Sequence, residues 1–575
     1  MEQVQVQFVR ENRTVLADRG ITLLAVQTEA GLRPDAPCGG QGKCGKCLVE
    51  IRSPGETAWR EVLACRTEVT ADLEVRTREA GALRVLTRGV LTEQDAWEPW
   101  LETVEVTVPP CPAGESTADW DRFTGALAEL GRGKPATDLA LASALNGLLR
   151  QSGGRITAAL DRQRALALWT GEKQTYMAAF DVGTTSIAGY LLRSDRPETV
   201  ATAGEPNPQA QFGADVIQRA NYALENGVEA LSSCVRGAVD ELLGELCRQA
   251  NIPREDVLAV SLVGNTCMHH LFLGVSPGSL VRSPYNPAVS EPLVLRAVDF
   301  GIHAAPGAAL LMLPVIAGFV GADTVGCLLA VGWERLEKLT LLIDIGTNGE
   351  IVLGTKDRMI ACSTAAGPAF EGAKIQCGMR GAPGAVDHVT WAPDGGLTWS
   401  VIGDQGVKGI CGSGLIDLVA ALRHTGAVDE SGRLTGGTDF RVGDTPVVLT
   451  QRDVREVQLA KGAISAGIRL LAQRLGVTLE DIQQVYIAGA FGSYMDPDSA
   501  CDIGLIPAQL RGKILAVGNA AGEGARLALQ SRAAWDRAQS LARQTEFLEL
   551  ASLPQFQDEF VDSLEFPELE EMKHA

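Results

Sequence analysis

The chain has little positive charge and lacks any segment suited to export. Its 575 residues contain 51 lysines and arginines against 71 aspartates and glutamates, which gives a net charge of −20 at pH 7. Such a surface repels the phosphates of nucleic acid, so a nucleic-acid partner is excluded. The N-terminus has neither a basic nor an apolar segment, so no secretory signal is expected and the sequence predicts a cytoplasmic protein.

Long apolar runs are also missing. The most apolar stretch, residues 307–333, is interrupted by Pro314, Asp323 and several glycines. A charged residue is costly within a bilayer, so this stretch predicts a buried strand, turn and helix and no membrane span. The length of the chain exceeds what one hydrophobic core can organise, so we expect several domains.

Paired Cys-x2-Cys units are scarce although cysteine is plentiful. The 13 cysteines include a single such unit, Cys44 and Cys47, and none of the six histidines lies near it. Structural zinc sites usually pair two units, so a zinc site is disfavoured, and a redox-active dithiol is the other alternative. Together with Cys38 and Cys65, the unit forms a spacing that predicts four metal-binding thiolates around a [2Fe–2S] cluster. The other nine cysteines are expected to be reduced core residues.

The residues around these cysteines predict a small α/β unit. Residues 3–9 alternate between polar and apolar like a half-buried strand, residues 22–30 predict a short helix, and residues 48–52 predict another strand. The glycines of the cysteine loop suit the tight turns that a cluster requires. The block resembles the [2Fe–2S] ferredoxin fold, a β-grasp, over residues 1–85. Its first cysteine gap is longer than that of plant-type ferredoxins and resembles the adrenodoxin-like variant.

Two similar motifs farther along the chain each follow an apolar strand. The first reads Asp-Val-Gly-Thr-Thr and the second reads Asp-Ile-Gly-Thr-Asn. Glycine lets the backbone turn toward a phosphate, the hydroxyls and amides can bind it, and each aspartate suits Mg²⁺. The pair resembles the hairpins with which the actin, Hsp70 and sugar-kinase superfamily grips ATP between two lobes. The predicted site residues are Asp181, Gly183, Thr184, Thr185, Asp344, Gly346, Thr347 and Asn348.

Further glycine-rich turns support a nucleotide site. Residues 485–493 form a strand that enters a turn, and they resemble the adenosine motif of that superfamily, with Gly489 and Gly492 facing the base and ribose. Gly518 begins another predicted turn, which extends to residue 524. Residues 409–417 are expected to open a helix with an anion-binding N-terminus. Each of these features alone is also consistent with a tight turn in a core.

Residues 86–172 carry the least information. Residues 121–131, 137–149 and 154–168 have the periodicity of helices, so we expect a linker followed by a small middle domain. The segment could tether a mobile ferredoxin domain or act as a packed spacer.

A [2Fe–2S] domain joined to an actin-like ATPase resembles the reductive activators of corrinoid proteins. The resemblance implies a multidomain α/β chain in three parts. These are a β-grasp ferredoxin domain (1–85), a linker with a small middle domain (86–172), and a duplicated actin-like ATPase domain (173–575, with lobes of about 173–335 and 336–575). Motifs shared with that family, beyond the cysteine loop and the two hairpins, are Gly264-Asn-Thr-x-Met-His, residues 314–323 and residues 367–372.

The resemblance also implies an activity. The chain would be an enzyme that passes one electron from its cluster to the Co(II) corrinoid of a methyltransferase-system protein and so regenerates Co(I). A ferredoxin-type cluster at about −400 mV is a weak reductant for this step, so MgATP would make the transfer possible. The corrinoid protein would be the partner, the family suggests a homodimer, and the electron donor is not identifiable.

Two other functions remain open from the sequence. One is a small-molecule kinase whose ferredoxin domain senses redox state, although no sugar-binding pattern is present. The other is an ATP-dependent activator of a different redox enzyme. His269 and His270 could contact a cofactor or be structural, and Asp323 could cap a helix or face the cleft between the lobes.

Overall fold

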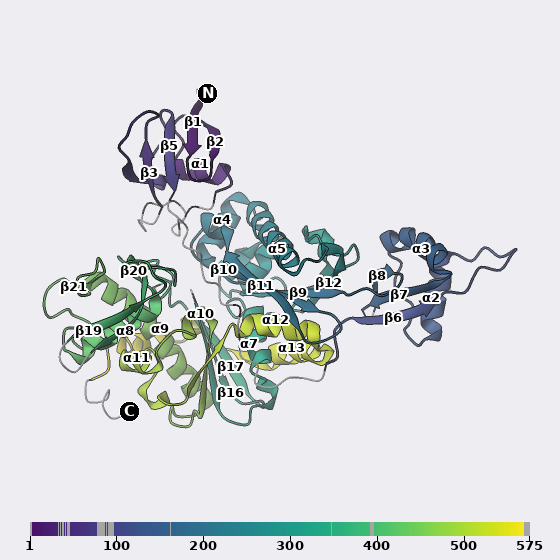
Figure 1. Cartoon of the computed structure of the whole chain (residues 1–575). Coiled ribbons are helices and arrows are strands. Elements are labelled where there is room, and N and C mark those ends of the chain that lie inside the picture. The colour runs from purple at the N-terminus through teal and green to yellow at the C-terminus, as the bar shows by residue number, and fades with distance from the viewer. Residues whose placement is uncertain are drawn as a thin grey trace.

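A computed structural model describes residues 3–568 of the chain, apart from residues 33, 35, 37–39, 41, 43–46, 78–86, 88, 90–96, 162, 347, 368 and 392–395. Figure 1 shows a small N-terminal module, a second small module formed by residues 102–169, and two larger lobes built on separate sheets. Within the described residues, no helix is long and apolar enough to cross a membrane.

The N-terminal module is a β-grasp. Its five-stranded sheet has the order β2-β1-β5-β3-β4, in which β1 is antiparallel to β2 and parallel to β5. Alternate side chains of the first strand are buried, as its sequence predicts. Thr22 caps the helix, its hydroxyl accepting the amide of Ala25. The elements are β1 (Gln3–Phe8), β2 (Arg13–Asp18), α1 (Leu23–Glu29), β3 (Leu48–Arg52), β4 (Arg60–Leu63) and β5 (Leu73–Thr77).

The second module corrects one expectation. It contains β6 (Glu102–Thr107), α2 (Asp119–Glu129), α3 (Leu139–Ser152), β7 (Arg155–Leu160) and β8 (Ala165–Trp169). Residues 154–168, expected as a helix, form the antiparallel β7–β8 hairpin instead. Gly153 and Gly154 adopt positive φ and end α3, and the Asp161 carboxylate accepts the amide of Arg164 and closes the hairpin turn. An apolar run of this length has no period that separates strand from helix, and pairing with β6 decides the outcome.

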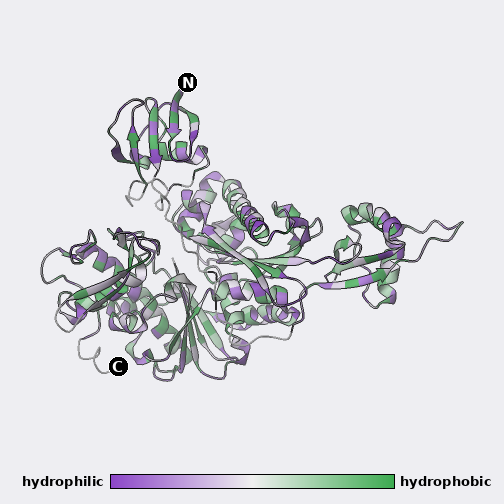
Figure 2. Cartoon of the chain, viewed as in Figure 1, coloured by the Kyte–Doolittle hydropathy of each residue, from purple (hydrophilic) through white to green (hydrophobic). Residues whose placement is uncertain are grey.

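Two six-stranded sheets share one topology over five of their strands. Hairpins β9–β10 and β15–β16 are antiparallel, and the first strand of each lies parallel to a later strand, β12 or β23. Figure 2 shows mainly hydrophobic residues along these strands, which agrees with their burial. The repeat confirms the duplicated fold. The first sheet contains β9 (Tyr176–Val182), β10 (Ser186–Arg193), β11 (Thr199–Pro206), β12 (Val257–Gly264), β13 (Leu293–Arg296) and β14 (Ala309–Met312). The second contains β15 (Thr340–Ile345), β16 (Gly349–Gly354), β17 (Met359–Thr364), β23 (Gln484–Ala488), β24 (Ile514–Gly518) and β25 (Thr545–Phe547).

Three helices lie between the two sheets in Figure 1: α7 (Ala322–Ala330), α12 (Ala520–Gln530) and α13 (Arg532–Gln544). Their buried side chains belong to one hydrophobic core that includes residues of both sheets. Helices α7 and α12 meet through their backbones, because a Cβ on Gly326 would lie 2.7 Å from the carbonyl oxygen of Ala521. A Cβ on Gly524 would in turn clash with the backbone of Gly326.

The remaining helices and short strands belong to one lobe or the other. The first lobe has α4 (Val216–Asn226), α5 (Glu229–Ala250) and α6 (Thr266–Leu273). The second lobe has α8 (Gly412–His424), α9 (Gln451–Leu475), α10 (Gly489–Gly492), α11 (Pro497–Asp502) and α14 (Phe556–Asp562). It also carries the short strands β18 (Ala385–Trp391), β19 (Leu397–Val401), β20 (Gly409–Ile410), β21 (Asp439–Arg441) and β22 (Val448–Thr450).

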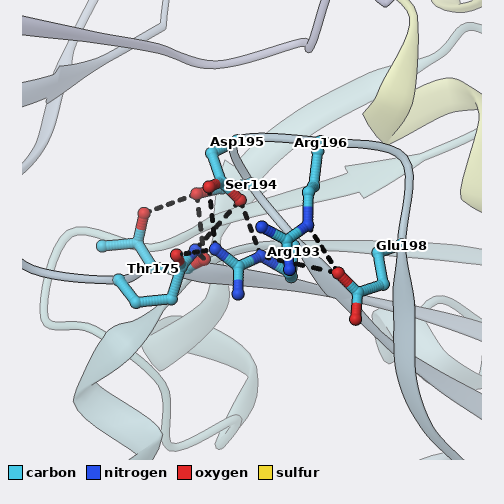
Figure 3. Close-up of polar contacts among 7 residues, drawn as sticks. Thr175, Arg193, Ser194, Asp195, Arg196 and Glu198 are labelled. Atoms are coloured by element: carbon cyan, nitrogen blue, oxygen red, sulfur yellow. Dashed lines mark hydrogen bonds and ion pairs between the residues drawn. The ribbon is translucent and has the colours of Figure 1, made fainter.

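A polar network holds the first hairpin at the end remote from its Asp-Val-Gly-Thr-Thr turn (Figure 3). Arg193 donates two hydrogen bonds to Asp195, of 2.9 and 2.8 Å, and these bonds lower the pKa of Asp195 to about 2. The hydroxyls of Thr175 and Ser194 lie 2.5 Å apart and join the two strand ends. The strands that carry the turn are therefore fixed from their far end.

Candidate functional site

The carbonyl groups of the first hairpin turn accept hydrogen bonds on the buried side of the turn. Asn207 donates its side-chain amide to the Gly183 carbonyl at 2.8 Å and its backbone amide to the Thr185 carbonyl at 2.9 Å. Arg219 donates to the Thr184 carbonyl at 2.6 Å. With these acceptors engaged, the turn can offer backbone amides and hydroxyls to an anion.

Arg219 places a positive charge directly behind this turn. The side chain is fully buried, and its Nε donates to the carbonyl of Gly213 at 3.0 Å. Its hydrogen-bond acceptors among the described residues are carbonyls, an amide and a thioether, and none is a carboxylate. Burial lowers the pKa of Arg219 to about 10, so the guanidinium stays charged at neutral pH. A buried cation whose hydrogen bonds go to neutral acceptors favours a phosphate on the other side of the turn.

Asp181 and Asp344 lie at the ends of equivalent strands, β9 and β15, and the charge of Asp344 acts on Asp181. Burial, followed by the charge of Asp344, raises the pKa of Asp181 to about 7, against a hydrogen bond from Asn519 that lowers it. Burial raises the pKa of Asp344 to about 6. The two aspartates that the motifs singled out therefore lie close to one another, as a shared nucleotide site requires.

Two further acids join this pair. Asp323, in the first turn of α7, has its pKa raised to about 8 by burial and by the charges of Asp344 and Asp181. Glu350 pairs with Asp344 across the second hairpin, and burial together with Asp323 and Asp344 raises its pKa well above the usual value. Of the two roles open to Asp323, the structure supports the one beside the aspartates. Motif reasoning missed Glu350, although its place opposite Asp344 in a two-strand hairpin was a usable signal.

The negative charges of these four neighbouring acids must be neutralised by bound protons or by a cation. Carboxylate oxygens are ligands that Mg²⁺ prefers, and Mg²⁺ usually keeps several waters or phosphate oxygens. Among the described residues, no group of three histidine, cysteine, aspartate or glutamate side chains could hold a metal ion by itself. The acids therefore fit a hydrated cation that a nucleotide helps to bind.

Three glycines of the predicted adenosine side have different roles. Gly489 has φ +88°, and a Cβ there would lie 2.7 Å from the Asp344 carboxylate, so this turn approaches the acids directly. Gly492 faces Ile487 instead, so its lack of a side chain serves packing. Gly518 has φ +68° and precedes Asn519, whose side chain donates to Asp181 at 2.9 Å. Residues 520–524, expected as part of a turn, are the start of α12.

The second hairpin turn is closed by the amide of Gly346, which donates to the carbonyl of Asn348 at 2.9 Å. Thr347 lies outside the described residues. The two hairpin turns occupy equivalent positions in the two sheets.

The cysteine loop is described only in part, because Cys38 and Cys44 lie outside the described residues. Cys47 is buried and Cys65 is half-buried, and the carbonyl of Cys47 accepts the amide of Ala64 at 2.8 Å. Gly40 and Gly42 have φ of +80° and +70°. A Cβ on Gly40 would press against Leu24 at 3.0 Å, and one on Gly42 would clash with Arg66. The loop is therefore confined to glycine at these points, which fits a backbone wrapped closely around a cluster.

The paired histidines behave differently from each other. His270 uses both ring nitrogens, one 2.7 Å from the Thr266 carbonyl oxygen and the other accepting the amide of Ala288 at 2.8 Å, so it is structural. His269 is fully buried, and burial lowers its pKa to about 3, so its ring is neutral. Asn265 caps α6, as its sequence predicts, and donates to the Thr184 hydroxyl at 2.9 Å.

Comparison with protein families assigns nearly the whole chain. Residues 338–574 match the C-terminal domain of RACo, described as the ASKHA domain, and residues 176–336 match the RACo middle region. Residues 91–175 match the RACo linker region, and residues 7–70 match a 2Fe-2S iron-sulfur cluster binding domain.

Individual relatives agree with these matches. The chain is 33% identical over 568 residues to the corrinoid activation enzyme RamQ of Eubacterium limosum, covering 92% of this chain and 94% of RamQ. It is 26% identical over 381 residues to a [Co(II) methylated amine-specific corrinoid protein] reductase of Methanosarcina barkeri, covering 60% and 68% of the two chains. A solved reductive activator for corrinoid, iron-sulfur protein has 31% identity and a TM-score of 0.75, with 98% of each chain covered.

Proposed function

Because the chain belongs to the RACo family of corrinoid-protein activators, we propose that it is an ATP-dependent reductive activator. It transfers one electron from a [2Fe–2S] cluster to the Co(II) corrinoid of a methyltransferase-system protein and regenerates Co(I). The observation that carries this proposal is similarity over 98% of the chain to a reductive activator, in a molecule that also brings Asp181 and Asp344 together.

The cluster is assigned to the N-terminal module. Its ligands in this proposal are Cys38, Cys44, Cys47 and Cys65, and the positive φ of Gly40 and Gly42 supports a loop shaped to hold it. The cluster, when bound, supplies the single electron. Arg66, which donates to the Gly42 carbonyl at 2.8 Å, orders the side of the loop nearest Cys65.

The nucleotide is assigned to the two hairpin turns. Gly183, Thr184 and Thr185 bind phosphate from one lobe, and Gly346, Thr347 and Asn348 bind it from the other. Asp181 and Asp344 hold hydrated Mg²⁺ between them. Gly489, Gly492 and Gly518 shape the adenosine side. The buried charge of Arg219 and the shared position of the acids support this arrangement.

ATP is needed because the electron must move uphill. Each ~59 mV of unfavourable potential lowers a one-electron equilibrium tenfold. Closure of the two lobes on ATP is proposed to change the environment of the partner's cobalt, which requires that the closed and open forms bind the partner with different affinities. A homodimer and a cytoplasmic location belong to the same proposal, and the physiological electron donor is a separate protein of unknown identity.

An anaerobic assay tests the function. Reduced, cluster-loaded protein is mixed with a Co(II) corrinoid protein of a methyltransferase system, and Co(I) absorbance is followed with and without MgATP. We expect Co(I) only with MgATP, and no Co(I) with Asp344→Asn. ATP hydrolysis without any change at cobalt, for several corrinoid partners, would favour a kinase or the activator of another redox enzyme.

A further inference from the structure

One hydrogen bond joins the phosphate turn of the first lobe to a loop of the second. The hydroxyl of Thr185 donates to the carboxylate of Glu371 at 2.9 Å. The two residues are 186 positions apart, so the contact depends on how the two lobes meet. Glu371 is half-buried, which leaves its carboxylate within reach of solvent water.

The backbone around Glu371 is held firmly. Phe370 stacks on Phe491 with ring centroids 5.1 Å apart and planes inclined by 14°. On the other side Gly372 has φ +75°, and a Cβ there would lie 2.6 Å from the amide of Met379. Phe491 belongs to α10, which begins at Gly489 beside Asp344. The same short helix therefore supports both the acids and the loop that carries Glu371.

Glu371 differs from the four clustered acids in its surroundings. The pKa values of Asp181, Asp323 and Glu350 are each raised by burial and by the charge of at least one other acid of this group, which includes Asp344. A cation held among them would occupy their oxygens. Glu371 instead contacts the Thr185 end of the turn, and its charge stabilises the guanidinium of Arg219. It is thus a carboxylate that contacts the phosphate turn through Thr185.

We propose that Glu371 is a catalytic residue of ATP hydrolysis, orienting the attacking water and accepting its proton. Before the nucleotide binds, the Thr185 hydroxyl donates to the carboxylate. A bound phosphate accepts that hydroxyl instead, and a water takes its place as a donor to the carboxylate. The water oxygen forms a bond to the γ-phosphorus while the bond to the β–γ bridging oxygen breaks. The proton goes to Glu371 and then to solvent, and the products are ADP and inorganic phosphate.

The inference rests on the proposed ATPase function and is tested on the full chain. Glu371→Gln keeps an oxygen that accepts the Thr185 hydroxyl but cannot accept a proton. We expect MgATP affinity within about threefold of wild type, and a single-turnover hydrolysis rate lowered about 100-fold or more. Glu371→Asp keeps a carboxylate but shortens the side chain by one methylene group, so its hydrolysis rate should lie between those of Glu371→Gln and wild type.

The matched control is Glu337→Gln, an exposed glutamate paired with Lys356 on the surface, which should leave both quantities unchanged. Wild-type hydrolysis in Glu371→Gln would overturn the proposal. So would equal losses of affinity and rate, because a residue that only joins the lobes would weaken nucleotide binding. Melting temperatures of all three variants separate a folding defect from either result.

Hydrolysis is measured with the protein alone and with a Co(II) corrinoid protein present. If wild type hydrolyses ATP but never yields Co(I), the activator function fails while the role of Glu371 is still tested. If wild type yields Co(I) with MgATP and Glu371→Gln hydrolyses normally, only the role of Glu371 fails. Absence of hydrolysis by wild type in both conditions overturns both proposals.

Discussion

The side-chain amide of Asn519 donates a 2.9 Å hydrogen bond to the carboxylate of Asp181, although the two residues are 338 positions apart. The oxygen of the same side chain accepts the amide of Gly522 at 2.8 Å and caps α12. One asparagine therefore ties the start of a helix between the sheets to the acid of the first hairpin. The bond also opposes the rise in the pKa of Asp181 that burial causes.

Replacing Asn519 with alanine should weaken nucleotide binding as well as the helix. Loss of the cap costs about 0.5–2 kcal/mol of stability, and loss of the bond to Asp181 raises the pKa of that carboxyl further. We expect MgATP affinity to fall by about tenfold in a binding titration at pH 7. Asp496→Ala removes a comparable cap, from α11, without touching an acid of the site. An equal loss of affinity in that control would contradict the role given to Asn519.

Gly489→Ala should damage the site more than its size suggests. The residue has φ +88°, and the added methyl would lie 2.7 Å from the Asp344 carboxylate. We expect a stability loss of about 1–3 kcal/mol and a loss of MgATP affinity, measured by denaturant unfolding and by titration. Gly476→Ala is the control, since Gly476 also has a positive φ, of +73°, but a Cβ added there would meet nothing within 4 Å. Normal nucleotide affinity in Gly489→Ala would count against the approach of this turn to the acids.

Arg219→Met should lower nucleotide affinity by removing the positive charge behind the first turn. It also leaves the carbonyls of Gly213 and Thr184 without their donor, at about 1–3 kcal/mol for each unsatisfied group. Arg423→Met is a suitable comparison, because Arg423 is also buried and donates to the Val428 carbonyl at 2.8 Å in the second lobe. Both variants should be less stable, but only Arg219→Met should bind MgATP more weakly, by about tenfold. Equal MgATP affinities of Arg219→Met and Arg423→Met would show that the charge of Arg219 has no part in binding.

The nucleotide-free protein should lose stability as the pH rises from about 4 to about 8. The pKa values of Asp344, Asp181 and Asp323 are raised to about 6, 7 and 8, so the folded protein keeps protons that the unfolded chain releases. Each unit by which a pKa is raised costs about 1.4 kcal/mol once the pH exceeds the folded value. Thermal unfolding at pH 6 and pH 8 measures the difference. Asp344→Asn should reduce the pH dependence, and an unchanged slope in that variant would contradict the assignment.

Cys47→Ser and Cys65→Ser should each lose the visible absorbance of a [2Fe–2S] cluster after anaerobic reconstitution. Serine oxygen is a harder and more basic ligand than thiolate, so the cluster should be unstable or absent. Cys111→Ser, at an exposed cysteine without ligand spacing, should retain the full absorbance. Retention of the spectrum in both ligand variants would show that other residues bind the cluster, whereas absence of the spectrum from the wild-type protein would favour the dithiol or zinc alternatives.

The parts of the fold that the sequence predicted well depend on local patterns. An apolar strand followed by Asp-x-Gly-Thr gave both hairpins, and the duplication then implied two similar sheets. Asn265 was recognisable as a helix cap because its side chain acts within three residues. Residues 154–168 were misassigned because strand pairing with β6, which local periodicity does not encode, decides their conformation.

Apart from Glu350, the site residues whose roles the sequence did not reveal share one property, which is that distant packing brings them to the site. Arg219 lies on a helix 35 residues after the turn it supports, and Glu371 and Asn519 reach the same turn or its aspartate from the second half of the chain. No spacing rule connects such positions. Only the way in which α12 and the loop before Gly372 dock makes their roles visible.

Helices α7 and α12 touch backbone to backbone at Gly326 and Gly524, with no layer of side chains between them. In most helix pairs, the side chains between the two helices can change rotamer and so accommodate small displacements. Here the two backbones are in direct contact, so a shift of α12 must displace α7 as well. Helix α12 begins next to Asn519, which is hydrogen-bonded to Asp181. Asp323 lies about one helical turn before Gly326. A displacement of Asp181 is therefore coupled through α12 and α7 to the position of Asp323.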